Sequence, residues 1–142
     1  MLGDMRGRVR KIGIISNTSR TSGDARRRLL AHFGLTGYFD SMVFSDEIGW
    51  RKPDPRIFAA AAKALQTPIG EILHVGDNPV EDAGGAENAG METLLLENPT
   101  PSDEQKLASS VASSAMAAVG ASAPFLGNRI RTLGEVLTHL SR

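Results

Sequence analysis

The sequence predicts an α/β fold with a three-layer, Rossmann-like parallel sheet flanked by helices. Short apolar runs alternate with longer segments of helical periodicity, which is typical of βαβ units. A polar cluster follows each apolar run directly, as it does at the carboxyl ends of parallel strands. The 142 residues suffice for one core that removes about 70% of the unfolded surface from water. We therefore expect a single domain over residues 1–142.

The first predicted strand covers residues 12–15 and ends in the polar cluster 16–19. The helix after it begins at Ser22, because a serine side chain can accept a hydrogen bond from an unpaired N–H of the first turn. It stops at Gly34, because glycine adopts the left-handed conformation that ends many helices. This segment forms the first βα unit.

The second predicted strand covers residues 42–44 and ends at the acidic cluster 45–47. Asp54 and Pro55 are typical of an N-cap followed by the first helical position, and this helix ends before Pro68. The segment between them has apolar residues at helical spacing and predicts a buried face.

The third predicted strand covers residues 72–75 and leads into the polar cluster 76–79. A helix follows it and finishes at Gly90, and a fourth strand covers residues 93–96. The βα units thus occupy residues 9–97.

The remainder of the chain carries no chemical motif. Residues from about 100 to 128 form an excursion rich in Ala and Ser. Residues 129–142 are apolar at helical spacing and predict a closing strand or helix that packs back onto the sheet.

The composition excludes several classes of function. The absence of cysteine removes disulfides, thiolate catalysis and cysteine-ligated metal clusters. The 16 basic and 16 acidic residues cancel, so no global field favours nucleic acid or an acidic membrane. No secretory signal is visible, and the longest uncharged stretch, residues 107–128, is not typical of a membrane span. We expect a cytoplasmic protein with no nucleic-acid or membrane partner.

Residues that suit phosphoryl chemistry follow the predicted strands. Ser16 and Asn17 come after the first strand, Lys52 precedes the second helix, and Asp77 and Asp82 follow the third strand. A hydroxyl and an ammonium can hold phosphoryl oxygens, whereas two carboxylates can hold Mg²⁺. Because the carboxyl ends of parallel strands meet at one edge, this set predicts a phosphoryl-transfer site there.

Three strings in this order resemble motifs of a known superfamily. Residues 13–18 (Gly-Ile-Ile-Ser-Asn-Thr), 52–58 (Lys-Pro-Asp-Pro-Arg-Ile-Phe) and 74–86 (His-Val-Gly-Asp-Asn-Pro-Val-Glu-Asp-Ala-Gly-Gly-Ala) resemble the second, third and fourth motifs of haloacid dehalogenase-like hydrolases. The resemblance spans residues 9–97, and the last string is the most specific. It is closest to the branch whose cap is inserted between the first and second motifs.

The resemblance implies a role for each candidate residue. Ser16 would hydrogen-bond the transferring phosphoryl group, and Lys52 would neutralise that group together with the nucleophile. Asn17 would lie beside the substrate, and Asp77 and Asp82 would hold or orient Mg²⁺. Acids at both fourth-motif positions favour a phosphatase over a dehalogenase. The implied substrate is a small phosphorylated metabolite.

The resemblance also implies a motif that the sequence lacks. Family members carry an aspartate nucleophile in an Asp-x-Asp motif after a central N-terminal strand, and no such motif occurs here. Asp4 is the only carboxylate before Ser16, and residues 1–11 are similar to the end of a cap helix. We expect the C-terminal core of a family member, without first motif and cap and catalytically incomplete. The alternative is a non-catalytic remnant that binds phosphate or a partner through the retained site.

Loss of a central strand would leave two sheet halves with unpaired edges. Three outcomes stay open: the halves close on one another, another chain supplies a strand or a second copy associates, or the natural gene product begins upstream of Met1.

Other polar residues have simpler interpretations. His74 lies within a strand and is expected in the core rather than as a ligand. Residues 26–28, all arginine, predict a solvated helix face. Asp46 and Glu47 predict a helix or loop cap, with metal or substrate approach as the alternative. Trp50 is equally compatible with local packing and with a substrate or cap contact.

Overall fold

The computed structural model describes residues 2–97, 129–132 and 134–140. The excursion expected at about 100–128 lies outside the described residues. The strands of the described part are β1 (Gly13–Ser16), β2 (Ser41–Phe44), β3 (Leu73–Gly76), β4 (Glu92–Leu96) and β5 (Arg129–Ile130). Each pairing between them is parallel, which confirms the predicted α/β class.

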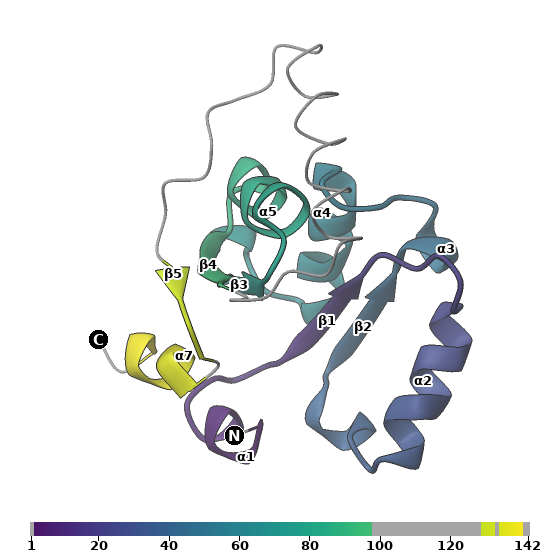
Figure 1. Ribbon diagram of the computed structural model, residues 1–142, viewed down its shortest axis with the longest axis horizontal. Coiled ribbons are helices and arrows are strands. Elements are labelled where there is room, and N and C mark those ends of the chain that lie inside the picture. The colour runs from purple at the N-terminus through teal and green to yellow at the C-terminus, as the bar shows by residue number, and fades with distance from the viewer. Residues whose placement is uncertain (1, 98–128, 133, 141–142) are drawn as a thin grey trace.

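Helices connect the strands and flank them (Figure 1). The α-helices of the described part are α1 (Leu2–Arg6), α2 (Gly23–His32), α3 (Ser45–Ile48), α4 (Pro55–Leu65), α5 (Gly85–Ala89) and α7 (Gly134–His139). The shorter turns among these residues are two 3-10 helices, Thr36–Tyr38 and Ile69–Glu71, and a π-helix, Pro79–Gly84. None of the helices in the described residues is long and apolar enough to cross a membrane.

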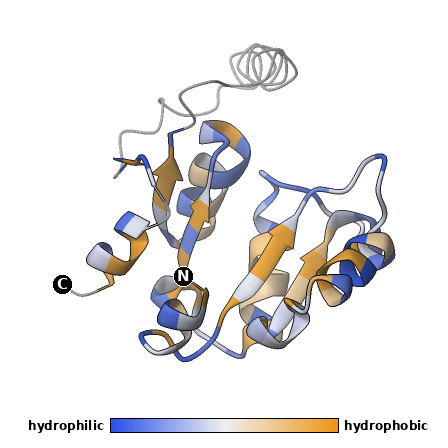
Figure 2. Cartoon of the chain, turned by 60° about the horizontal axis from the view of Figure 1, so that its bottom comes forward, coloured by the Kyte–Doolittle hydropathy of each residue, from blue (hydrophilic) through white to orange (hydrophobic). Residues whose placement is uncertain are grey.

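The strands form two sheets rather than one. β1 pairs with β2, and β3 pairs with β4, which pairs with β5. In the described part of the chain, β1 and β3 do not pair with each other, so the two halves are not closed directly on one another. Figure 2 shows hydrophobic residues on the strands and on the helices beside them.

The caps expected from the sequence set the ends of the main helices. The Ser22 hydroxyl accepts a hydrogen bond from the N–H of Ala25 at the start of α2, and Gly34 beyond its end has a φ of +67°. The Asp54 carboxylate accepts from the N–H of Arg56 at the start of α4. These local contacts explain why both helices begin where predicted.

Helix α4 joins the two halves through the main core. Its residues Ile57 and Phe58 are fully buried, and each such side chain contributes about 1.5–3 kcal/mol through removal of apolar surface from water. Their cluster contains buried residues from β2, α4, α5 and the position before β4: Val43, Ile57, Phe58, Ala61, Ala86 and Met91. The split sheet is therefore held together by this helix layer.

A second cluster closes the other sheet. Leu94 of β4, Ile130 of β5 and Val136 of α7 are buried together, and Met5 of α1 packs against them. The predicted closing segment is thus a short strand followed by a helix. Ile130 lies in the strand, because its backbone pairs with Leu96, and the helix begins only at Gly134.

The turn after β3 differs from the regular helix expected there. Residues Pro79–Gly84 form a π-helix, and the N–H groups of Asp82 and Ala83 both donate to the carbonyl of Asn78. The Asn78 side chain also caps the turn by accepting from the N–H groups of Val80 and Glu81. Single π turns are frequent at functional sites.

Candidate functional site

The predicted site residues gather at the carboxyl ends of β1 and β3. Asn17 follows β1 and holds the segment that carries Lys52. Its side-chain amide donates to the Lys52 carbonyl at 3.0 Å, and its Oδ1 accepts from the Lys52 N–H at 2.7 Å. The same amide nitrogen donates to Glu81 at 3.1 Å. In this arrangement Asn17 positions Lys52.

The Lys52 ammonium bridges the two sheets. It donates to the Ile15 carbonyl of β1 at 3.3 Å and forms an ion pair with Asp82, which follows β3. The side chains are only 11% and 7% exposed, so water screens this pair weakly. The pair fixes one positive charge beside the end of β1.

Asp82 is held by several donors at once. Besides Lys52, His74 Nε2 lies 3.3 Å from its Oδ1, and the Asn78 N–H donates to its Oδ2 at 3.0 Å. Burial alone would raise the pKa of Asp82, but the His74 contact, the Lys52 charge and the Asn78 N–H outweigh it, so the pKa lies below its ordinary value. The carboxylate is therefore ionised at neutral pH.

Gly76 allows this close approach. A Cβ at Gly76 would lie 2.3 Å from Asp82 Cγ, which no side chain could tolerate without movement. His74 has an edge-to-face contact with Phe58 at 5.4 Å, as expected for a histidine packed in the sheet. Its other contact, to Asp82, makes it part of the site as well.

Arg26 is the site residue that sequence reasoning missed. Its Nη1 donates to the Ser16 hydroxyl at 2.8 Å, and its Nε is buried without a hydrogen-bond partner among the described residues. The expectation of a solvated arginine face is wrong for Arg26, whereas Arg27 keeps 42% of its side chain exposed and pairs with Glu47 at 2.7 Å. Adjacent helical residues point about 100° apart, so a run of three cannot share one face.

Arg28 matches the expectation, since its side chain is 80% exposed and pairs with Asp24 at 2.9 Å. No sequence pattern singles out Arg26 from its two neighbours, because its contact with Ser16 depends on the tertiary fold.

The acidic pair after β2 acts as a cap. Asp46 accepts from the N–H of Gly23 at 3.0 Å and from the Thr18 hydroxyl at 2.7 Å. These two bonds, led by that from Gly23, lower the pKa of Asp46. Glu47 forms an ion pair with Arg27. Both carboxylates therefore fasten α2 to α3, which supports the simpler of the two interpretations.

Trp50 contacts an arginine that is close to it in the sequence. The Arg56 guanidinium stacks 3.4 Å from the centre of its ring and is itself held by Asp54 at 2.6 Å. One face of the indole is therefore covered by a cation. This contact supports local packing, and 41% of Trp50 stays exposed.

The two acids after β3, Asp77 and Asp82, differ in solvent exposure. Asp77 is exposed, whereas Asp82 is buried in its ion pair. Within the described ranges, no three His, Asp or Glu side chains gather as a metal cage. Mg²⁺ is commonly bound by one or two carboxylates, with water and substrate phosphate completing its shell. Asp77 and Asp82 supply two carboxylates of the kind that such a site uses, and both oxygens of Asp82 already have partners within the chain.

Lys52, Asp77 and Asp82 line one end of a cavity of about 860 Å³. Ser16 is not part of its wall, but the preceding residue, Ile15, is. One phosphate-directed candidate, Lys52, thus lines the same cavity as the two metal-directed acids, and Ser16, which accepts from Arg26, follows the lining residue Ile15.

A parallel α/β fold with an ammonium, a hydroxyl and carboxylates at the carboxyl ends of its strands belongs to the class of proteins that bind ligands at that edge. The comparison with known families is specific: the sequence model for haloacid dehalogenase-like hydrolase matches residues 2–90. The chain belongs to the haloacid dehalogenase-like hydrolase family.

Related proteins include several named as phosphatases. The chain is 37% identical over 98 residues to haloacid dehalogenase-like hydrolase domain-containing protein 3 of Bos taurus, covering 69% of this chain and 38% of that protein. It is 43% identical over 76 residues to 5-amino-6-(5-phospho-D-ribitylamino)uracil phosphatase YigB of Escherichia coli, covering 54% and 31%. The chain therefore spans well under half the length of these relatives.

The fold of this chain is similar to that of a solved structure. The crystal structure of a HAD phosphatase from Thermococcus onnurineus matches with a TM-score of 0.73 and 26% identity, over 98% of this chain and 54% of that one. The likeness covers the split sheets and their helices together, which supports the predicted Rossmann-like architecture.

Proposed function

We propose that this chain forms the phosphate-binding part of a hydrolase site that acts on small phosphorylated metabolites. The proposal rests on the fixed position of the Lys52 ammonium at the end of β1. Asn17 bonds to the Lys52 backbone, and Asp82 forms an ion pair with the Lys52 side chain. Phosphatase names among the relatives favour the same substrate class.

In this proposal Ser16 and Lys52 bind the phosphoryl oxygens, and Arg26 supplies a second cation. Arg26 already donates to the Ser16 hydroxyl, so an anion bound there would lie close to both groups. Asn17 acts as a positioning residue for Lys52, because both of its side-chain polar atoms bond to the Lys52 backbone. Together these groups bind and orient an anion.

Asp77 and Asp82 are the residues that would hold Mg²⁺. The ion, when bound, supplies additional positive charge to the phosphoryl oxygens. Asp77 is the more accessible carboxylate, and Asp82 primarily anchors Lys52. We expect metal binding to depend on phosphate, since the two carboxylates alone form no cage.

The second candidate function is phosphate or partner binding without turnover. An acyl-phosphate mechanism needs an attacking carboxylate, and none of the proposed residues supplies one. Hydrolysis of an aryl phosphate with and without Mg²⁺ separates the two functions. Clear metal-dependent turnover by this chain, abolished in Asp77→Ala, would establish a complete enzyme.

The binding proposal is tested by calorimetric titration with inorganic phosphate in the presence of Mg²⁺. We expect saturable binding that weakens at least tenfold in Lys52→Met and in Ser16→Ala. Lys63→Met is the matched control, since Lys63 is an exposed residue of α4 outside the site. Equal phosphate affinity in all four proteins would refute the proposed site.

A further inference from the structure

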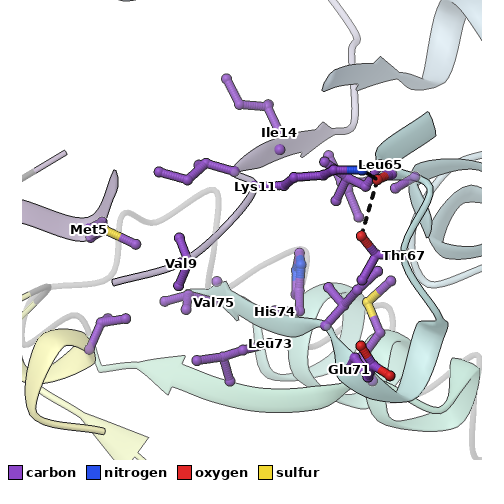
Figure 3. A pocket seen from close by; sticks show the side chains of 18 of the residues that line it. Met5, Val9, Lys11, Ile14, Leu65, Thr67, Glu71, Leu73, His74 and Val75 are labelled. Carbon is purple, nitrogen blue, oxygen red and sulfur yellow. Dashed lines mark hydrogen bonds between the residues drawn. The ribbon is translucent and has the colours of Figure 1, made fainter. Parts of the chain in front are cut away.

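Arg26 approaches the Ser16 hydroxyl from outside the cavity. Ile14 of β1 and His74 of β3 lie on opposite sides of the cavity in Figure 3, and Lys52 also lines it. Arg26 is not one of the lining residues, although its Nη1 lies 2.8 Å from Ser16 Oγ. Arg26 therefore contacts the proposed site through Ser16 rather than as part of the cavity wall.

The chemistry of this hydrogen bond fixes the role of each partner. A guanidinium carries N–H donors and no acceptor, so the Ser16 oxygen must accept. The Ser16 hydrogen is then left for another acceptor, and within the described residues it is directed to the Asn17 carbonyl at 3.5 Å. That distance exceeds the roughly 2.5–3.0 Å that is typical of a hydroxyl donor. The hydroxyl hydrogen thus lacks a good acceptor in the described part of the chain.

A phosphoryl oxygen is the acceptor that would complete this arrangement. In the proposed function Ser16 binds such an oxygen, and hydrogen bonds to a charged acceptor are the stronger kind. A serine hydroxyl without fixed neighbours rotates freely and can turn its lone pairs toward an anion instead. The Arg26 N–H prevents this, because a hydroxyl hydrogen turned toward it would clash with the donor. The hydrogen therefore points away from Arg26.

The position of the Arg26 side chain is not explained by its own hydrogen bonds. Its Nε is buried without a hydrogen-bond partner among the described residues. A buried donor left unpaired lowers stability, so native proteins keep few of them. The Ser16 contact is what this position of the guanidinium provides.

The start of α2 fixes the point from which Arg26 extends. The Gly23 N–H donates to both carboxylate oxygens of Asp46, at 3.2 and 3.0 Å. A Cβ at Gly23 would lie 2.8 Å from Phe44 Cβ and 2.6 Å from Glu47 Oε1, so no side chain fits there unless the helix moves. The first turn of α2 is thus packed closely against the end of β2, and Arg26 follows in that turn.

We propose that Arg26 is a positioning residue that makes the Ser16 hydroxyl a fixed hydrogen-bond donor to the phosphoryl group. This inference rests on the proposed function, because it needs an anion that accepts from Ser16. It assigns Arg26 a role beyond its charge. Without Arg26 Nη1 the hydroxyl rotates, and Ser16 loses most of its contribution to phosphate binding. The effect of Ser16 on phosphate affinity therefore depends on Arg26.

A double-mutant cycle in the full chain tests this dependence by calorimetry with inorganic phosphate and Mg²⁺. We expect Ser16→Ala to weaken phosphate binding at least tenfold in the wild-type chain but less than threefold in the Arg26→Met chain. Arg28→Met is the matched control, because Arg28 lies on the same helix and its side chain is 80% exposed. Ser16→Ala should still weaken binding at least tenfold in the Arg28→Met chain. A tenfold effect in the Arg26→Met chain would overturn the proposal.

Displacement of α2 gives a second test that leaves the Ser16 and Arg26 side chains in place. Gly23→Ala should weaken phosphate binding at least threefold in the wild-type chain and have no further effect in the Arg26→Met chain. Gly37→Ala is the control, since a Cβ there meets no atom within 4 Å. Equal phosphate affinity of the two glycine variants would contradict the proposal. Circular dichroism checks that each variant is folded, and Arg26→Leu replaces Arg26→Met if the latter is not.

The results also separate this inference from the proposed function. If Ser16→Ala leaves the phosphate affinity of the wild-type chain unchanged, the proposed phosphate site is wrong and the role of Arg26 is refuted with it. If Ser16→Ala weakens binding equally in the wild-type and Arg26→Met chains, the phosphate site stands and only the positioning role of Arg26 is wrong.

Discussion

Replacement of Lys52 by methionine tests the central ion pair most directly. The change keeps the length and apolar stem of the side chain but leaves the Asp82 carboxylate, which is 7% exposed, without its cation. Removal of one partner from a buried pair typically costs about 3–5 kcal/mol. Asp82 retains the Asn78 N–H and the His74 contact, so we expect the lower part of this range, about 3 kcal/mol.

Urea unfolding followed by circular dichroism measures this loss, and a loss of about 3 kcal/mol corresponds to a fall in Tm of about 6–12 °C for a domain of this size. Lys63→Met, on the exposed side of α4, should stay within about 0.5 kcal/mol of wild type. Addition of Asp82→Asn to Lys52→Met should recover part of the loss, because the unpaired charge disappears. A loss below about 1 kcal/mol, or no recovery in the double variant, would refute the reasoning.

The loss of stability in Lys52→Met depends on pH. The pKa of Asp82 is lowered in the folded chain, so its ionised form contributes stability above the ordinary value of 3.8. That contribution is lost as the pH falls below 3.8 toward the folded-state pKa. The difference between wild type and Lys52→Met should therefore narrow in acid.

Three further results are expected. Arg26→Ala should weaken phosphate binding at least fivefold in calorimetry with little change in Tm, and an unchanged affinity would remove Arg26 from the site. Asp77→Ala should abolish the increase in phosphate affinity on addition of Mg²⁺, and survival of that increase would place the metal elsewhere. The Arg56 side chain lowers the pKa of Asp54 to about 2, so Arg56→Ala should return it toward 3.8 in an NMR titration; a pKa unchanged in the variant would exclude this cause.

The starts of α2 and α4 and the positions of the strands were predictable because they depend on local chemistry. Ser22 and Asp54 cap their helices through side chains only two or three residues away from the N–H groups that they bind. Likewise, the apolar runs needed only their pattern to be assigned as strands. Such features follow from neighbours in the sequence.

The clustering of site residues was predictable only in part. Placement of Lys52 near β1 and of Asp82 near Lys52 followed from motif order, but the contact of Asn17 with the Lys52 backbone requires the tertiary fold. Arg26 was assigned to solvent because a basic run usually is solvated. Its contact with Ser16 depends on how α2 returns toward β1, which no local pattern encodes.

The π-helix after β3 also depends on tertiary contacts rather than on local sequence. Asp82 must turn back toward Asn78 N–H and Lys52, and the wider turn accommodates this while Gly76 leaves room for the carboxylate. Propensity for a regular helix over this segment is outweighed by a buried ion pair. The departure from local expectation therefore falls at the residues that define the site.

Charge balance explains why the proposed phosphate site needs more than one cation. The Lys52 charge is largely matched by Asp82, so alone it offers an anion little net attraction. Arg26 beside Ser16 adds a positive charge for which the Ser16 hydroxyl is a neutral partner. The negative charge of Asp77 would repel a bound phosphate, and Mg²⁺ bound at Asp77 would turn this repulsion into attraction. Since coupling between two ligands is reciprocal, phosphate should raise the affinity for Mg²⁺ by the same factor by which Mg²⁺ raises the affinity for phosphate.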